Sequence, residues 1–533
     1  MKPLRKAVWI SALVSALALI TSSTAVAGVT TPVRASALAS PLAACASRDA
    51  AQIAVTGGRN FLNAEVEPTL GVFGDHLIGQ WHEDRWSNGG GHGIGVGVSS
   101  NGGVNWTNST MPWDACAPGT PASLAGYLRN SDPWVSFGPD GTAYASGLAF
   151  NHGFPSWANT VAAATSRDFG ATWQNVQPIP GSSFTQFAQS TDKNSTTADP
   201  RTAGTAYTVW DTLIEPTDHP DDNPRTSSYT GPAYFSKTTD YGVHWSQAKV
   251  IIDTKVRQQT INNIILVDPR NGTLYDFTNL IVSPNTPRQG TRSNELLAFV
   301  KSTNGGDTWT EPQVVAPLNQ LGVIDPNTGE RLRTGDVLFS VAIGGDGNLY
   351  ATWQASTSYQ KQLKQSLGNW DDQIVFAAST DGGQTWSGPT VIHTASGLPT
   401  FTPTVAVNNG TIAVTYYDNR NLTPNQTANL PTDYWVEYST NGGVSFSNEQ
   451  RITQTPFDAR TAPVARGFFL GDYEGLQPMG SGFGVLFVKT NCNANDAAGQ
   501  DFPTGGACAP ASSTSTTTSN TNPTDAFFAK ASP

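Results

Sequence analysis

The chain is poor in charged residues and in cysteine. Only 13% of its 533 residues are Asp, Glu, Lys or Arg, and acidic residues outnumber basic ones by 41 to 30. The formal charge of −11 argues against a nucleic-acid-binding surface, because such surfaces are strongly basic. Long helical periodicity is also missing, whereas Gly (52) and Pro (35) are abundant, which is typical of an all-β, turn-rich protein.

Long apolar segments are missing as well, apart from one near the start of the chain. Lys2, Arg5 and Lys6 precede an apolar stretch over residues 7–20, and small residues follow at 25–27. This order predicts a secretory signal peptide over residues 1–27, followed by a flexible leader over residues 28–48. No later segment is apolar for 18 residues, so we expect no membrane span. The signal peptide predicts a secreted, extracellular protein, which we expect to be a monomer.

The four cysteines all follow the predicted signal peptide. An even number of cysteines in an exported chain favours disulfide bonds. Cys492 and Cys508 bracket a short loop, so we pair them, which leaves Cys45 with Cys116. No Cys-x-x-Cys pair is present, so we expect no zinc site and no cofactor. An acidic stretch at residues 218–223 offers oxygen ligands, which keeps calcium open as an alternative.

One short pattern occurs six times along the chain. It reads Ser/Thr, any residue, Asp/Asn, any residue, Gly, two further residues and an aromatic, with Phe446 in place of Trp in the last copy. The copies occupy residues 99–106, 166–173, 238–245, 302–309, 379–386 and 439–446. A motif that recurs at a long, loose period is typical of a repeat architecture.

Each copy lies between two short apolar runs that favour strands, so we expect it to form a hairpin turn. The Ser/Thr and Asp/Asn side chains can bond nearby backbone groups, and the Gly can adopt a left-handed conformation. The aromatic side chain then supplies buried area where one unit meets the next. We refer to the six copies as the boxes, and we assign them a structural role without chemistry.

The spacing of the boxes predicts a β-propeller, a ring of four-stranded antiparallel blades, over residues 49–533. Six blades follow from the six boxes, over about residues 67–113, 131–180, 185–253, 260–316, 336–393 and 399–454. Three further strands are expected at 468–473, 483–488 and 526–529, and residues 51–55 could supply a fourth. We therefore favour a seventh blade closed by both chain ends, with six blades as the alternative. A Ser/Thr-rich loop at about 509–524 interrupts this last unit.

Chemistry-bearing residues gather at the strand ends opposite the boxes. These positions hold carboxylates, arginines and aromatics, including Asp192 and Lys193 in the third unit and Asn151 and His152 in the second. Convergent carboxylates, guanidinium groups and aromatic rings suit carbohydrate recognition and acid/base chemistry. The alternative is that these residues pair with one another in a polar central channel.

The boxes resemble the Asp-box, or bacterial neuraminidase repeat, and the chain is similar to the sialidase-like superfamily over about residues 60–490. Residues 80–87, 132–134 and 471–475 resemble an exported bacterial subgroup of it. The resemblance implies a site on the face opposite the boxes, a tyrosine nucleophile with a glutamate partner, an aspartate acid/base and three arginines. The Phe-Arg-Ile-Pro segment of the family's first blade is absent, and Glu67-Pro68-Thr69 stands there instead.

Because that segment is absent, the family's catalytic set does not transfer by motif, and we name candidates from their positions at the strand ends. Tyr473 is the candidate nucleophile, Glu67 or Glu83 its activator, and Asp84 or Asp132 the acid. Arg85, Arg129 and Arg420 form a candidate anion clamp. The remaining candidate substrate-binding residues are Trp86, Trp134, Trp210, Asp211, Asp418 and Asp472.

Three functions remain open at this point. The first is a secreted glycoside hydrolase, most similar to an exo-α-sialidase, acting on acidic or sialylated glycans. The second is a propeller that binds glycans or proteins without turnover. The third is a polysaccharide lyase that pairs Tyr473 with His82 or His152. The expected partner is a glycan or polysaccharide, or a protein in the second case, and we expect no nucleic-acid partner and no membrane span.

Overall fold

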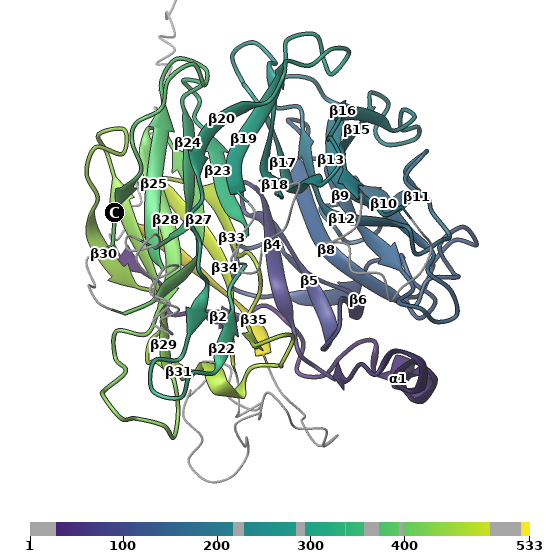
Figure 1. Cartoon of the computed structure of the whole chain (residues 1–533), viewed down its shortest axis with the longest axis horizontal. Coiled ribbons are helices and arrows are strands. Elements are labelled where there is room, and N and C mark those ends of the chain that lie inside the picture. Colours follow the sequence, from purple (N-terminus) through teal and green to yellow (C-terminus); the bar gives the residue numbers. More distant parts are fainter. Residues whose placement is uncertain are drawn as a thin grey trace, which may run out of the picture.

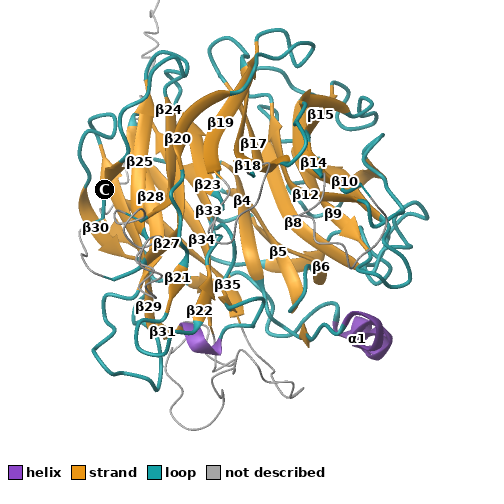
Figure 2. Ribbon diagram, viewed as in Figure 1, coloured by secondary structure: helices purple, strands orange, loops and turns teal. Residues whose placement is uncertain are grey.

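The computed structural model describes residues 28–216, 229–283, 294–335, 337–356, 372–393, 398–490 and 524–533. This part of the chain is almost entirely β-structure and forms the predicted β-propeller (Figures 1 and 2). The predicted signal peptide, the calcium candidate at 218–223 and the predicted Cys492–Cys508 bond lie outside the described residues, as does the Ser/Thr-rich loop up to residue 523.

The described strands build seven four-stranded antiparallel units, each listed from the innermost strand outward. The first two units are β4 (Val66–Phe73), β5 (His76–Trp86), β6 (Gly91–Ser99) and β7 (Thr107–Thr110), then β8 (Arg129–Phe137), β9 (Ala143–Phe150), β10 (Asn159–Ser166) and β11 (Gln174–Pro178). The third and fourth are β12 (Gln189–Ala198), β13 (Ala206–Ile214), β15 (Ala233–Thr238) and β16 (Lys249–Ile252), then β17 (Gln258–Val267), β18 (Leu274–Val282), β19 (Asn294–Ser302) and β20 (Gln313–Pro317).

The remaining units complete the ring. The fifth and sixth are β23 (Phe339–Ile343), β24 (Leu349–Ala355), β25 (Gln373–Ser379) and β26 (Thr390–Val391), then β27 (Thr400–Asn408), β28 (Thr411–Asp418), β29 (Pro431–Ser439) and β30 (Ser447–Arg451). The last is β33 (Gly475–Met479), β34 (Gly482–Thr490), β35 (Thr524–Ser532) and β1 (Gly28–Val29). Each innermost strand contacts the next one, and β33 contacts β4, so the ring closes.

Both chain ends contribute to the last unit, but not with the segments that we predicted. The outer strand is β1, supported by β2 (Val33–Arg34), and both pair with β35. Residues 28–34, expected in a flexible leader, are therefore part of the sheet. Residues 51–55, expected as a strand, lie in helix α1 (Asp49–Thr56). The edge of β35 is already paired by β1 and β2, so residues 51–55 have no strand partner there.

The innermost strand of this unit also begins later than predicted. The expected strand at 468–473 is replaced by β32 (Phe468–Phe469), which pairs in parallel with β22 (Arg331–Arg333). Gly471 then passes close to the backbone of Glu67, where a Cβ would lie 2.9 Å from the Glu67 nitrogen. Its φ of +148° suits glycine and breaks the strand. The strands predicted at 483–488 and 526–529 are confirmed within β34 and β35.

The box turns form the hydrogen bonds that their sequence predicts. In the fourth box, Ser302 Oγ accepts from the Gly306 N–H at 3.0 Å and donates to Asn304 Oδ1 at 2.9 Å. Asn304 Oδ1 also accepts from the Thr308 N–H at 3.0 Å, and Trp309 Nε1 donates to the Gly306 carbonyl at 3.1 Å. The Gly-to-Ser/Thr bond recurs in all six boxes at 2.8–3.0 Å.

The boxes also join neighbouring units. A Cβ on Gly306 would lie 2.3 Å from the ring of Phe235 in the preceding unit, and one on Gly443 would lie 2.1 Å from Phe376. Trp309 packs edge-on against Phe235, with ring centroids 5.3 Å apart. The glycine therefore leaves room for an aromatic ring of the previous unit, and the box aromatic covers that ring.

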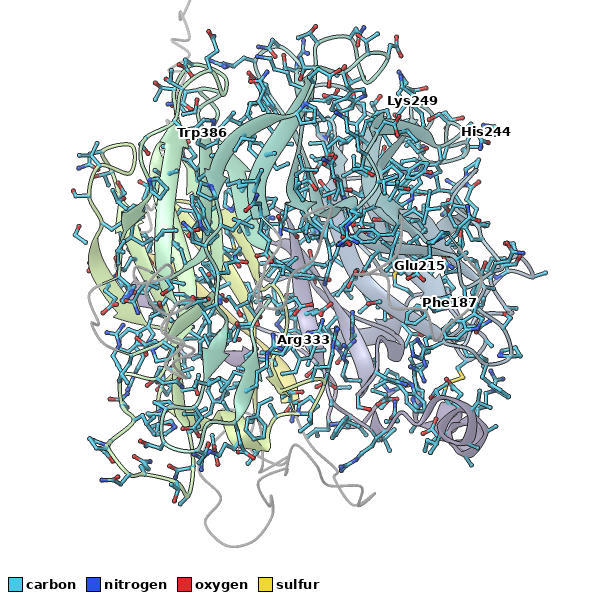
Figure 3. The ribbon with its side chains drawn as sticks, viewed as in Figure 1. Phe187, Glu215, His244, Lys249, Arg333 and Trp386 are labelled. Carbon is cyan, nitrogen blue, oxygen red and sulfur yellow. A yellow bond between two sulfur atoms is a disulfide. The ribbon has the colours of Figure 1, made fainter. Side chains whose placement is uncertain are left out.

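Short elements cover the end of the ring opposite the boxes. In Figure 3 the box-side residues His244, Lys249 and Trp386 lie toward the top, and Phe187, Glu215 and Arg333 lie lower. The short elements comprise η1 (Ala43–Arg48), α1, β3 (Asn60–Phe61), β14 (Thr230–Gly231), β21 (Val323–Ile324), β22, β31 (Phe457–Asp458), η2 (Ala459–Thr461) and β32. The predicted bond between Cys45 and Cys116 is present, with Cα atoms 5.9 Å apart, and anchors η1.

Candidate functional site

Five innermost strands carry the same local irregularity where they approach the central axis. Glu67, Asp132, Lys193, Asn262 and Thr402 all have positive φ angles, between 41° and 63°. Each lies where the pairing with the second strand of its unit shifts register. Such a bulge re-aims a side chain, and left-handed backbone costs roughly 1–3 kcal/mol at a residue other than glycine. Strain repeated at equivalent positions marks this end of the axis as a candidate site.

The Lys193 ammonium lies among three buried carboxyl groups. Its Nζ atom lies 3.0 Å from Asp472 Oδ2, 3.4 Å from Asp132 Oδ1 and 3.8 Å from Glu67 Oε2. Arg333 binds the same Asp472 carboxylate through Nε at 3.1 Å and NH2 at 2.6 Å. We call these five side chains the ion plug.

The charges of the ion plug control its protonation. Burial alone would raise the pKa of Asp472, but the charges of Arg333 and Lys193 outweigh it and hold that pKa well below the usual range. Burial would lower the pKa of Lys193, but the neighbouring carboxylates, Asp132 first, raise it. The plug therefore contains ionised Asp472 and ionised Lys193 at neutral pH.

His82 supports the plug from the second strand of the first unit. Its Nε2 lies 3.0 Å from Glu67 Oε2 and 2.9 Å from the Asp132 backbone N–H, and its Nδ1 lies 3.0 Å from Arg85 NH1. Burial, followed by the charge of Arg85, lowers the pKa of His82 well below its usual value. The imidazole is therefore neutral, and it fixes Glu67 and Arg85 relative to each other.

A pocket of about 330 Å³ lies over the plug, and we call it the mouth pocket. Its inner half is lined by Glu67, Arg85, Asp132, Asp192, Lys193, Arg333 and Arg466. Its outer half runs between the second and third units and is lined by residues that include Phe150, Asn151, His152, Trp157, Gln186, Phe187 and Glu215. The pocket thus combines a charged inner half with an aromatic outer half.

Three guanidinium groups reach the inner half of the mouth pocket. Arg85 and Arg333 both lie against the ring of Phe469, with their Cζ atoms 4.9 and 4.3 Å from its centroid. Burial, followed by the charge of Arg333, lowers the pKa of Arg85 to about 10. Arg466 is exposed and makes no hydrogen bond or ion pair within the described part of the chain. This arrangement can bind an anionic group of a ligand.

Asp192 is the most exposed carboxyl group of the inner half. It is half-buried and accepts a hydrogen bond from the Lys193 N–H at 3.0 Å. Burial, followed by the negative charge of Asp132, raises the pKa of Asp192 to about 6. Asp192 and Asp132 are neighbouring carboxyl groups of one site, which we call the Asp192–Asp132 pair, and a raised pKa at one member of such a pair suits a proton donor.

Tyr473 and Trp134 line a different space. A channel of about 270 Å³ follows the propeller axis between the innermost strands, and both side chains lie in its wall. Their ring centroids are 6.0 Å apart, and Lys193 Nζ lies 5.2 Å from the Tyr473 ring. Burial, followed by the charge of Glu67, raises the pKa of Tyr473 well above its usual range. A hydrogen bond with the Glu67 side chain adds to this rise, so the Tyr473 hydroxyl lies beside the Glu67 carboxyl group of the ion plug.

Glu83 and Asp84 point into a separate buried cluster near α1. Asp84 Oδ2 lies 2.8 Å from His92 Nδ1, and Asp49 binds the other ring nitrogen at 2.7 Å. Burial alone would lower the pKa of His92, but its hydrogen bonds to Asp49 and Asp84 raise it to about 9. Burial, followed by the charge of Asp84, raises the pKa of Glu83 to about 8. Neither carboxyl group lines the mouth pocket.

Two of the three predicted clamp arginines lie outside the mouth pocket. Arg129 stacks on Trp86, with Cζ 4.1 Å from the ring centroid, and donates to Gln52 at 2.9 Å and to Asn88 at 2.8 Å. It therefore holds α1 and the rim of the pocket. Arg420 pairs with Asp418 and Glu449 in the sixth unit and stacks on Trp435.

The other predicted binding residues also divide between the charged site and the protein core. Asp472 belongs to the ion plug and Arg85 to the inner half of the pocket. Asp211 is buried behind Asp192 and accepts from Asn263 at 3.3 Å, and burial raises its pKa well above the usual range. Trp210 packs in the core beside Tyr234, with ring centroids 5.8 Å apart. Of the predicted substrate-binding residues, only Arg85 lines the mouth pocket itself.

Several pocket residues were missed because they lie in insertions between the repeating units or in a loop within one. Arg333 is in β22, before the fifth unit, and Arg466 lies between η2 and β32. Trp157 and Phe187 lie in loops of the second and third units. The sequence did contain one indication of these insertions. Residues 318–335 and 455–472 are longer than the connections that a unit of four short strands and one box requires.

The donor set Glu67, His82 and Asp132 has ligand atoms within 4.8 Å of one another and resembles a metal site. Lys193 Nζ already contacts Asp132 and Glu67, and Arg85 donates to His82. These cations occupy the positions from which a metal ion would bind and repel it. We therefore assign no metal role to this set.

No helix within the described residues is long and apolar enough to cross a membrane. No protein-family model matches the chain, and no curated protein matches it. The chain is similar to a solved structure of the Hadza microbial sialidase Hz136 (TM-score 0.41, 14% identity), covering 77% of this chain and 70% of that one.

Two other solved structures show the same distant similarity. The Penicillium chrysogenum α-L-arabinanase complexed with arabinobiose has a TM-score of 0.44 at 12% identity, covering 73% of this chain and 93% of that one. The phage phi92 endosialidase has a TM-score of 0.44 at 10% identity, covering 89% of this chain and 68% of that one. The chain is thus distantly similar to sialidases and to an arabinanase.

Proposed function

We propose that this protein is an exported glycoside hydrolase that acts on acidic glycans, including sialylated ones, in the mouth pocket. The observation that carries the proposal is the juxtaposition of three guanidinium groups with the Asp192–Asp132 pair in the inner half of one pocket. A guanidinium binds a carboxylate through paired, charge-assisted hydrogen bonds. Glycosidic bond cleavage needs a carboxyl group that is protonated and a second that is ionised.

In the proposed reaction the acidic sugar lies over the ion plug with its carboxylate toward Arg466 and Arg85. Arg466 is the primary contact because it has no ion-pair partner in the described chain. Asp192 protonates the oxygen that leaves the sugar, since its pKa of about 6 keeps part of it protonated near neutral pH. Asp132 and Glu67 stabilise the positive charge that develops on the sugar ring. Water then adds to the anomeric carbon, and the Asp192 carboxylate takes up the proton of that water, which restores the acid.

This assignment differs from one based on Tyr473. The Tyr473 ring lines the axial channel, on the wall that it shares with Trp134, whereas Asp132 and Asp192 line the mouth pocket. We therefore expect Tyr473→Phe to keep most of the activity, within about fivefold of the unchanged protein. Loss of activity by several orders of magnitude in that variant would instead support Tyr473 as the nucleophile.

The proposal is tested by measuring sugar release from a panel of sialosides and uronides. The general acid is then identified with Asp192→Asn, which we expect to lower kcat at least 100-fold on alkyl glycosides. The loss should be much smaller on a dinitrophenyl glycoside, because a good leaving group needs no proton. Asp253→Asn, at an exposed position in the same unit, is the matched control and should change neither rate.

Two results would replace the proposal with one of its alternatives. Retention of acidic glycans on an array, with no product from any member of the panel, would identify a binding propeller. Product that absorbs in the ultraviolet, as an unsaturated sugar does, would identify a lyase.

A further inference from the structure

The outer half of the mouth pocket presents half-buried aromatic rings. Trp157 lies between His152 and Phe187, with ring centroids 5.5 Å and 4.9 Å away and both contacts edge-on. All three side chains are half-exposed, and Phe150 continues the same wall. Large aromatic side chains are normally buried by other parts of the protein. Several partly exposed rings in the wall of one cavity therefore indicate a surface that a ligand covers when it binds.

The aromatic wall is held in place before any ligand arrives. Asn159 Nδ2 donates to the Trp157 carbonyl at 3.2 Å and to the Gln189 carbonyl at 2.8 Å, so it joins the loops on both sides of the pocket. The Trp157 ring packs on Gly153, where a Cβ would lie 3.0 Å from the ring. A surface that is already ordered loses little entropy when a ligand covers it.

The charges of the outer half disfavour a second acidic group. Burial, followed by the charge of Arg129, lowers the pKa of His152 to about 4, so the imidazole is neutral at physiological pH. Glu215 adds a carboxyl group to the lining, and the three arginines of the pocket all lie in the inner half. A neutral ring with one apolar face and hydroxyl groups at its edge fits a wall of this kind.

We propose that the outer half is a binding subsite for a neutral sugar ring, stacked against Trp157 and Phe187, next to the acidic sugar bound in the inner half. The preferred substrate is then a glycan in which an acidic unit is linked to a neutral one. This inference rests on the proposed hydrolase function for its catalytic readout. It rests on the aromatic wall for its binding readout, and the two can fail separately.

The catalytic readout compares two substrates with the same acidic sugar. One is its methyl glycoside, and the other is its glycoside with lactose, for example sialyllactose. We expect the unchanged protein to cleave the lactose conjugate at least tenfold more efficiently in kcat/KM. Trp157→Ala and Phe187→Ala should each reduce that ratio about tenfold or more, and Trp157→Phe should preserve it because stacking survives. An unchanged ratio in both alanine variants would overturn the subsite.

The binding readout does not need catalysis. Lactose alone, titrated into the protein, should show saturation-transfer signals from its ring protons by NMR, and Trp157→Ala should abolish them while Trp157→Phe keeps them. If no acidic glycan is cleaved but this pattern is seen, the hydrolase proposal fails and the subsite stands. If acidic glycans are cleaved but lactose binding is absent or insensitive to Trp157, the subsite is wrong and the hydrolase stands.

Discussion

Lys193→Met removes the central cation of the ion plug and leaves a side chain of similar length. In the unchanged protein the ammonium lies 3.0 Å from Asp472, 3.4 Å from Asp132 and 3.8 Å from Glu67. All four side chains are buried, so little water can reach them to replace the missing charge. In the variant, Arg333 is the cation that still contacts these carboxyl groups directly, and the neutral His82 and the Ser131 hydroxyl, which donates to Asp132 at 3.0 Å, give further support.

The size of the effect follows from these distances. With an effective dielectric constant of about 20, each contact corresponds to an attraction of roughly 4–6 kcal/mol, most of which repays the cost of burying the charges. Removing one partner from a buried pair typically costs about 3–5 kcal/mol, and we expect Lys193→Met to lower the free energy of unfolding by that amount. Because the pKa of Lys193 is raised, its contribution is fully present below the unfolded-state pKa of about 10.4 and is lost only as pH rises through the folded value.

The assay is urea unfolding at pH 7 and again at pH 4.5. The destabilisation should shrink at the lower pH, because the carboxyl groups that have lost their cation take up protons instead. Lys237→Met is the matched control, since Lys237 pairs with Asp307 at 3.2 Å but 70% of that Asp307 side chain is exposed. That pair should be worth about 1 kcal/mol or less. Equal losses in the two variants, or a loss in Lys193→Met that does not depend on pH, would refute the reasoning.

Three further predictions follow from the same structure. Because the general acid must be protonated, kcat/KM should fall on the alkaline side with an apparent pKa near 6. Asp132→Asn removes the charge that helps to raise the pKa of Asp192, so this fall should move to lower pH. If it does not move, Asp192 is not the acid. Glu83→Gln should be more stable than the unchanged protein at pH 8.5 but not at pH 4.5. The folded-state pKa of Glu83 is raised to about 8, so the stability that the protonated group contributes is lost as pH rises from the unfolded value of about 4.3. Thermal unfolding at both pH values measures this, with exposed Glu311→Gln as the control. Gly443→Ala should lower the free energy of unfolding in urea by about 2–4 kcal/mol, because the added methyl group would lie 2.1 Å from the Phe376 ring. Gly410→Ala, with a φ of +81° but open space around it, should lower it by only about 1–2 kcal/mol. Equal losses would contradict the role of the box glycine in joining units.

The local features of the fold were predictable because each depends on a few neighbouring residues. The box turn needs only a short polar side chain, a second one two positions on and a glycine, and all six copies form the same hydrogen bond. The Cys45–Cys116 bond followed by elimination once Cys492 was paired with Cys508 across a short loop. The closing strand was assigned to the wrong N-terminal segment, since which segment reaches β35 depends on the path of the chain over the whole ring.

The candidate site was predictable only in part. Glu67 and Asp132 lie near the starts of β4 and β8, as predicted, whereas Asp472 lies in the segment before β33; all three carboxyl groups meet at Lys193. Glu83 lies on the same strand as His82 but on the opposite face, which places it in the buried cluster near α1 and not in the pocket.

By itself, the sequence determined the repeating architecture, because six boxes at a long period specify turns, strands and the side of the ring on which chemistry can gather. Only the tertiary structure decided which side chains share a pocket. Arg333 and Arg466 come from insertions whose course depends on a parallel pairing between β22 and β32, far apart in the chain. The positive-φ bulges re-aim Glu67, Asp132 and Lys193 toward the axis. The physical reason is range: a turn is fixed by hydrogen bonds within a few residues, whereas a site is fixed by the closure of the ring.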